Sequence, residues 1–141
     1  MNSKEPIIVI EDDLDDQDML REVFQELGVT YELRFFDDCD KAYAHLMSLH
    51  KKPFLILCDI NLPKINGIEL KQRIDSTDKL RKMAIPFVFL TTSDTQQTVD
   101  AAYQRTNLQG YFQKSHTMSD IKRKVKLILE YWTESLHPYE N

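Results

Sequence analysis

Short apolar runs alternate along this chain with longer segments in which apolar residues recur at helical spacing. Runs of four to six residues without a charge, bounded by turn-forming residues, are typical of strands buried in a parallel sheet. The first, third and fourth runs fit this description, whereas the second is partly alternating and indicates an edge strand. The five predicted strands are 7–10, 31–36, 54–58, 86–90 and 109–113.

Five helices are predicted from apolar residues that recur every three or four positions. They are one that carries Leu20, Val23 and Phe24 and ends at Gly28, one after Asp38, one after Gly67, one over about 94–105, and one from 117 or 119 to about 136. The charged run 75–82 is interpreted as a solvated connection. It lies between the third helix and the fourth strand.

Alternating strands and helices predict an α/β fold with a doubly wound, five-stranded parallel sheet. Such sheets bind ligands at the carboxyl ends of the strands, near the point where the strand order reverses. If the order is 2-1-3-4-5, the first and third strands are neighbours at that point. No internal repeat or linker is evident, so residues 1–141 are expected to form one domain, with a compact core over about 5–136 and no output domain.

Polar residues stand where the predicted strands end: Asp12, Asp13, Asp59, Thr91 and Lys114. Three converging carboxylates repel one another, and a divalent cation such as Mg²⁺, which prefers oxygen ligands, relieves that repulsion. A lysine and a hydroxyl nearby can stabilise the charge of a transferring phosphoryl group. A carboxylate in this setting can act as the nucleophile and form an aspartyl phosphate.

Each of these residues also has a simpler interpretation. Asp12 and Asp13 could favour a helix N-terminus through the helix dipole, and Asp59 could cap a turn. Lys114 alone would be a solvated lysine. The arrival of all of them at strand ends of one sheet favours the functional interpretation.

Composition excludes several classes of protein. The net charge of −5, with 42% hydrophobic and 29% charged residues, disfavours nucleic acid or an anionic membrane as a partner. No apolar run exceeds about six residues, so no segment is expected to span a bilayer. Cys39 and Cys58 do not suggest a disulfide framework. Without a recognisable signal peptide, the expected location is the cytoplasm.

The motifs around these residues resemble the bacterial response-regulator receiver domain over nearly the whole chain. They are Glu-Asp-Asp after the first strand, CDINLPKINGIEL around Asp59, FLTTSD after the fourth strand and GYFQK after the fifth. The resemblance implies a flavodoxin-like receiver fold with Asp59 as phosphoacceptor. It also implies that Mg²⁺ or Mn²⁺ is bound by Asp12, Asp13, Asp59 and the backbone carbonyl of Asn61.

The resemblance further implies that Thr91 and Lys114 contact the phosphoryl group and that Tyr111 is a switch residue coupled to Thr91. One departure is Ser115, which follows Lys114 where receivers commonly have a proline joined by a cis bond. A cis bond without proline costs about 3–4 kcal/mol, so the loop is either trans or strained. Asn61 and Ser93 stand where receivers tune the lifetime of the phosphoryl group.

The resemblance implies a histidine kinase or phosphotransfer protein as the source of the phosphoryl group and a protein target downstream. The helix at 94–105, the fifth strand and the last helix form the expected surface for a partner or a homodimer. The leading hypothesis is a phosphoryl-accepting signalling module that is not an enzyme in its own right. The alternatives are a receiver that binds its partner without phosphorylation and a Mg²⁺-dependent phosphatase that uses an aspartyl phosphate.

Overall fold

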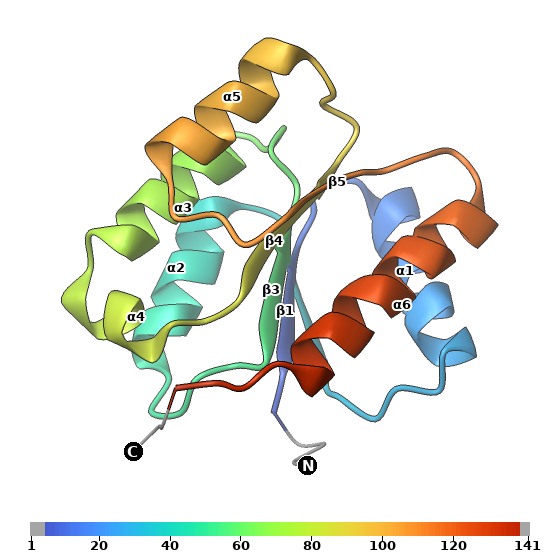
Figure 1. The fold of residues 1–141 in the computed structure, drawn as a ribbon, viewed down its shortest axis with the longest axis horizontal. Helices are drawn as coiled ribbons and strands as arrows, with labels where there is room; N and C mark the ends of the chain where they lie inside the picture. Colours follow the sequence, from blue (N-terminus) through green and yellow to red (C-terminus); the bar gives the residue numbers. More distant parts are fainter. Residues whose placement is uncertain (1–4, 139–141) are drawn as a thin grey trace.

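Five parallel strands form one sheet in the order β2-β1-β3-β4-β5. The computed structural model describes residues 5–138. The strands are β1 (Ile7–Ile10), β2 (Leu33–Phe36), β3 (Leu55–Cys58), β4 (Phe87–Thr91) and β5 (Tyr111–Gln113). All four neighbouring pairs are parallel. The predicted fold class and strand order are therefore confirmed (Figure 1).

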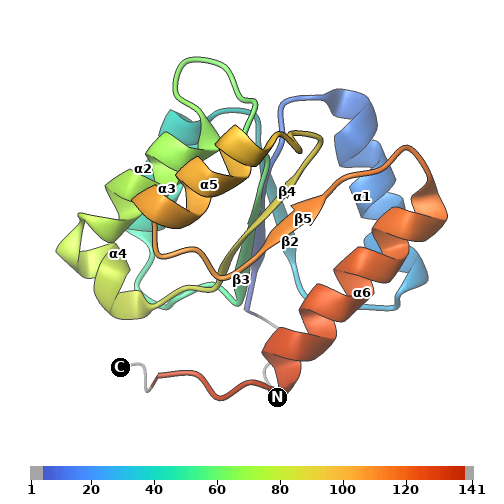
Figure 2. The same cartoon turned by 45° about the horizontal axis from the view of Figure 1, so that its top comes forward.

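Helices cover both faces of the sheet (Figures 1 and 2). On one face lie α1 (Leu14–Glu26) and α6 (Met118–Glu134), which run side by side. On the other lie α2 (Cys39–Ser48), α3 (Gly67–Asp75), α4 (Asp78–Met83) and α5 (Gln96–Arg105). The described residues thus form six helices around the sheet.

Strand side chains alternate between two separate cores, as a pleated strand requires. In β1, Ile8 and Ile10 pack with the core on the α2–α5 side, whereas Ile7 and Val9 pack with the core against α1 and α6. The residues of β1, β3 and β4 are buried throughout. This double burial explains why these strands are uninterrupted apolar runs in the sequence.

The prediction that the charged run 75–82 is a solvated connection, and hence that there are five helices, is wrong. Residues 78–83 form α4. Leu80 is almost fully buried in the core. The helix ends at Met83, and Ala84, which follows it, adopts a left-handed conformation with φ of 50°. A six-residue helix that buries one side chain leaves too little periodicity to be found in a run of charges.

The end of the last helix lies slightly earlier than predicted, at Glu134. The chain then turns back, and a hydrogen bond of 2.8 Å joins the ring Nε2 of His137 to the carbonyl of Trp132. Within residues 5–138, none of the helices combines the length and apolar character that crossing a bilayer requires.

Candidate functional site

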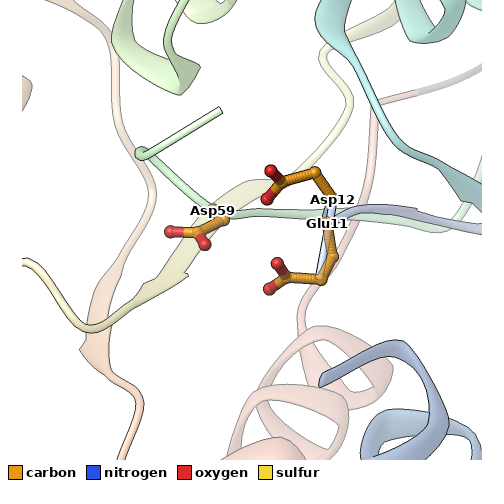
Figure 3. Close-up of side chains that lie close together, drawn as sticks. All are labelled: Glu11, Asp12 and Asp59. Atoms are coloured by element: carbon orange, nitrogen blue, oxygen red, sulfur yellow. The ribbon is translucent and has the colours of Figure 1, made fainter. Parts of the chain in front are cut away.

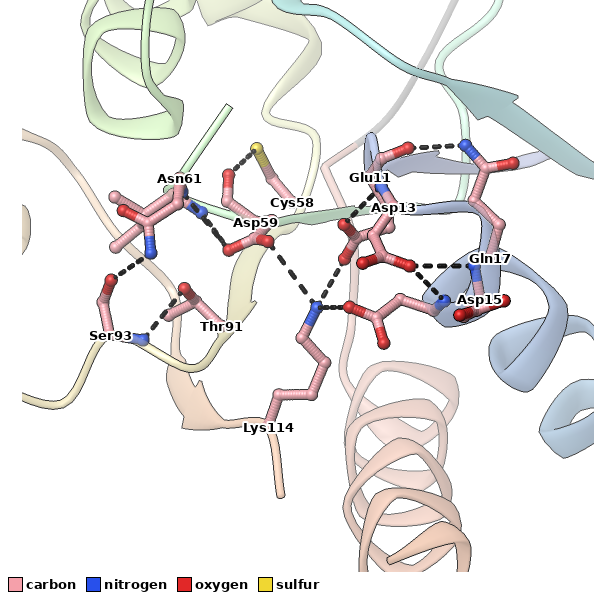
Figure 4. A network of polar contacts seen from close by, with 12 residues as sticks. Glu11, Asp13, Asp15, Gln17, Cys58, Asp59, Asn61, Thr91, Ser93 and Lys114 are labelled. Atoms are coloured by element: carbon pink, nitrogen blue, oxygen red, sulfur yellow. Dashed lines mark hydrogen bonds and ion pairs between the residues drawn. The ribbon is translucent and has the colours of Figure 1, made fainter. Parts of the chain in front are cut away.

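The register of the sheet brings four strand ends together at one edge. Ile10 and Cys58 are partners in neighbouring strands, and the amide of Asp59 donates to the carbonyl of Ile10 over 3.0 Å. On the other side of β3, the amide of Lys114 donates to the carbonyl of Thr91 over 2.7 Å. The residues that follow β1 and β3 are therefore adjacent, and Lys114 follows β5 beside them (Figure 4).

Three carboxylates lie close together at this edge: those of Glu11, Asp12 and Asp59. One oxygen from each lies within 4.8 Å of the others, and Figure 3 shows the three side chains close together. Glu11 and Asp59 are buried, whereas Asp12 is exposed to solvent. An oxygen-only cluster of this kind has the ligand chemistry that Mg²⁺ and Mn²⁺ prefer.

Glu11, and not Asp13, completes this cluster. The Oδ1 atom of Asp13 accepts hydrogen bonds from the amides of Asp15 and Asp16, at 2.8 and 3.1 Å, and so caps α1. Of the predicted acids, the structure groups Asp12 and Asp59 with Glu11, whereas Asp13 lies outside this group. For Asp13 the simpler interpretation, a carboxylate at a helix N-terminus, describes its contacts.

Lys114 inserts its ammonium among the acids. Its Nζ lies 2.5 Å from Glu11 Oε1, 2.9 Å from Asp16 Oδ2 and 3.6 Å from Asp59 Oδ2. Only 5% of the residue is exposed. Burial acts to lower the pKa of Lys114, but the hydrogen bond to Glu11 and the charges of Asp59 and Glu11 outweigh it and raise the pKa above its ordinary value. The ammonium is therefore a fixed positive charge in the site.

Glu11, the nearest partner of Lys114, has a raised pKa. Burial raises the pKa of Glu11 to about 7, against the lowering effects of the hydrogen bond and the charge of Lys114. The Glu11 backbone carbonyl accepts a 2.6 Å hydrogen bond from the buried side-chain amide of Gln17. Glu11 is held from both its side chain and its main chain.

Asp59 is positioned by the loop that follows it. Its Oδ1 accepts from the amides of Ile60, at 2.7 Å, and Asn61, at 3.3 Å. Its Oδ2 is the atom nearest Lys114. The two hydrogen bonds to Oδ1 therefore hold the carboxylate in place, with Oδ2 beside Lys114.

Ser93 connects the remaining predicted site residues. Its amide donates to Oγ1 of Thr91 over 3.2 Å, and its Oγ accepts from Nδ2 of Asn61 over 2.7 Å. The hydroxyl of Tyr111 donates to its carbonyl over 2.5 Å. Thr91 is fully buried, whereas Tyr111 is partly exposed. Burial and the nearby charge of Asp94 raise the pKa of the Tyr111 hydroxyl.

The loop after Lys114 adopts the trans alternative. Residues 5–138 contain no cis peptide bond, so the bond from Lys114 to Ser115 is trans. The missing proline therefore carries no cis penalty here.

Comparison with known proteins identifies the family. The model of the response regulator receiver domain matches residues 7–126. The chain belongs to the response-regulator receiver family. It is 31% identical to response regulator Rcp1 of Synechocystis over 96% of this chain and 93% of that protein. It is 33% identical to the probable methanogenesis regulatory protein FilR2 of Methanothrix harundinacea, over 89% of this chain and 82% of that protein.

Solved receivers have the same fold. The phosphorylated cyanobacterial phytochrome response regulator RcpA matches with a TM-score of 0.85 at 30% identity, covering 96% of this chain and 99% of that one. The Mn²⁺-bound form of Rcp1 matches with a TM-score of 0.81 at 31% identity and the same coverage. The predicted receiver fold and two-component signalling class are confirmed. This receiver accepts a phosphoryl group in a phosphorelay, and its acidic pocket fits that role.

Two residues of the site were not among those predicted. Glu11 was visible as the first member of the Glu-Asp-Asp motif, but the sequence does not show which two of the three acids face Asp59. Asp16 contacts Lys114 across 98 positions of the chain. Nothing in the local sequence indicates this contact.

Proposed function

We propose that Asp59 is the phosphoacceptor of this receiver. A carboxylate oxygen of Asp59 forms the new O–P bond, and the bond between the phosphorus and the donor breaks. The donor would be the phosphohistidine of a kinase or phosphotransfer protein, or a small phosphodonor. The observation that carries the proposal is the insertion of the Lys114 ammonium, 3.6 Å from Asp59 Oδ2, into the carboxylate cluster.

We propose that Glu11, Asp12 and Asp59 hold the divalent cation, together with the backbone carbonyl of Asn61. The fit rests on three carboxylates that share a space 4.8 Å across and on the absence of nitrogen or sulfur ligands from that group. The ion, Mg²⁺ or Mn²⁺, supplies positive charge that offsets the carboxylates and the incoming phosphoryl oxygens. A Mn²⁺-bound form is known for the similar protein Rcp1.

Lys114 and Thr91 complete the phosphoryl-binding groups in this proposal. The ammonium of Lys114 has three N–H donors and lies beside Asp59, where charge on the transferred group would develop. The Thr91 hydroxyl accepts from the amide of Ser93, which leaves its own proton available to a phosphoryl oxygen. Tyr111 would couple to this event through the same residue, because its hydroxyl donates to the Ser93 carbonyl.

The test is phosphorylation by a small acyl phosphate in the presence of Mg²⁺, followed by intact-protein mass spectrometry. The wild type should gain one phosphoryl group, and Asp59→Asn should gain none. Asp78→Asn, at the exposed start of α4, is the matched control and should behave as the wild type. An unmodified wild type would overturn the proposal. Multiple turnover of simple phosphomonoesters would favour the phosphatase alternative.

We propose that signalling uses the α5–β5–α6 face. A groove of about 450 Å³ lies there, lined by residues that include Tyr103, Tyr111 and Trp132. Tyr103, Leu127 and Tyr131 are each more than half exposed, and such a patch is typical of an interaction site. The partner would be a downstream protein or a second copy of the chain. Sedimentation with and without phosphorylation should detect a homodimer, and Leu127→Asp should abolish it.

We propose that this module catalyses its own phosphorylation and dephosphorylation and turns over no external substrate. Because its phosphodonor would be a cytoplasmic histidine kinase or phosphotransfer protein, we place it in the cytoplasm. Equal affinity of a downstream partner for wild type and Asp59→Asn would instead favour the phosphorylation-independent alternative.

A further inference from the structure

Asp16 contacts Lys114 from the first turn of α1. Its Oδ2 accepts from the Lys114 ammonium at 2.9 Å, and its own amide donates to Asp13 Oδ1 at 3.1 Å. Asp16 is about one-third exposed and does not belong to the group of three carboxylates that could share an ion. It therefore touches the site's lysine while standing outside the site's metal-binding cluster.

The burial of Lys114 makes each of its acceptors matter. A buried ammonium needs partners for its three N–H groups, and losing one costs more than losing a surface ion pair. Glu11 is the nearest acceptor, at 2.5 Å, followed by Asp16 at 2.9 Å. Asp59, at 3.6 Å, lies beyond hydrogen-bond distance. Two carboxylates thus hold the ammonium by hydrogen bonds.

Glu11 faces two competing demands. Its Oε1 is occupied by Lys114 and its Oε2 accepts from the amide of Asp13 at 3.1 Å. The same carboxylate belongs to the candidate metal cluster. A divalent cation and the ammonium of Lys114 would therefore compete for Glu11. Asp16 also accepts a hydrogen bond from Lys114, but it does not belong to the candidate metal cluster.

We propose that Asp16 is a positioning residue for Lys114. It gives the ammonium an acceptor outside the metal cluster, so that Lys114 can release Glu11 when a cation binds and still remain beside Asp59. This inference rests on the proposed function of the site. It adds a fourth acid, supplied by the first turn of α1, to the residues on which metal binding and phosphoryl transfer depend.

The direct test compares Asp16→Asn with Asp15→Asn. Both variants remove one negative charge from the same turn of α1, but only Asp16 contacts Lys114. Mg²⁺ affinity is measured by calorimetric titration of the unphosphorylated protein. We expect Asp16→Asn to bind Mg²⁺ about tenfold more weakly than Asp15→Asn, the size of one hydrogen bond to a charged group. Equal affinities in the two variants would overturn the proposal.

A double-mutant cycle separates action through Lys114 from a direct effect on the metal. In a Lys114→Met background the ammonium no longer competes for Glu11, so Asp16→Asn and Asp15→Asn should have equal effects on Mg²⁺ affinity. If Asp16→Asn keeps its full additional effect in that background, Asp16 acts on the metal by itself and is not a positioning residue.

Conservative rescue provides the second variant. Asp16→Glu keeps the carboxylate and should recover most of the lost affinity, and it also serves if Asp16→Asn does not fold, as judged by circular dichroism. If Asp16→Asn does not fold, a Mg²⁺ affinity of Asp16→Glu below that of Asp15→Asn would contradict the proposal. The proposed function fails separately, if the wild type neither binds Mg²⁺ nor becomes phosphorylated.

Discussion

Gly67 lies directly against the backbone of Asp59. A Cβ atom built on Gly67 would come within 2.3 Å of the Asp59 carbonyl oxygen and 2.9 Å of the Phe89 ring. The amide of Gly67 donates to the carbonyl of Ile60 over 2.9 Å, so the start of α3 is tied to the loop that follows Asp59. The helix can approach the site this closely because residue 67 has no side chain.

Gly67→Ala should therefore damage both stability and the site. Overpacking against a main-chain atom typically costs about 1–3 kcal/mol, and relief of the clash would displace Asp59. We expect a lower urea midpoint and slower phosphorylation by a small phosphodonor. Gly28→Ala is the control, since Gly28 has a φ of 67° but open space around it. It should lose about 1 kcal/mol of stability with an unchanged phosphorylation rate.

The cluster of Glu11, Asp12 and Asp59 predicts which acids support metal-dependent stability. An ion that binds only the folded state stabilises it, by about 2.7 kcal/mol at a hundredfold excess over Kd. Saturating Mg²⁺ should raise the melting temperature of the wild type and of Asp13→Asn, because asparagine still caps a helix. The rise should be much smaller in Glu11→Gln. The opposite ranking would restore Asp13 as the ligand.

The two thiols should be chemically inert in the folded protein. Burial, with the charges of Asp38 and Asp40, raises the pKa of Cys39 to about 12, and burial raises the pKa of Cys58 well above its ordinary value. Thiolates are the reactive form. Iodoacetamide at pH 8 should add nothing to native protein and two adducts in concentrated urea, as counted by mass spectrometry. Rapid native labelling would contradict the burial of both residues.

His45 should make the fold less stable in mild acid. Burial and the charge of Arg34 lower the pKa of His45, and Nη1 of Arg34 lies 3.0 Å from its Nε2. The folded state therefore favours the neutral ring, so this contribution to stability is present above the unfolded pKa of about 6.5. It is lost as pH falls below that value. Urea unfolding at pH 7.5 and 5.5 should show a smaller difference for His45→Gln than for the wild type.

Much of the site was predictable because strand ends leave a local signature. Asp59 and Lys114 each follow a strand, and the parallel order brings those ends to one edge. Uninterrupted apolar runs arise where both faces of a strand are buried, as in β1, β3 and β4. The polar residue that breaks such a run is conspicuous. For these residues, local pattern and topology rules were sufficient.

The choice between Glu11 and Asp13 depended on the path of the chain after β1. Three consecutive acids are equivalent in composition, and their directions follow from where the strand stops and where α1 begins. Because α1 begins at Leu14, Asp13 becomes its cap and Glu11 is left facing Asp59. Helix boundaries are among the features that sequence patterns locate least well. A shift of one residue therefore changes which acid is the proposed ligand.

Other features depend wholly on packing between distant segments. α4 exists because Leu80 reaches the core. Asp16 meets Lys114 because the first turn of α1 and the residue that follows β5 lie at the same edge of the sheet. Hydrophobic periodicity depends on burial along each segment, so it is visible in the local sequence. Strand order follows from general rules of topology once the segments are known. Contacts between single polar groups require ångström-scale placement of separate elements. Only the packed structure supplies that placement.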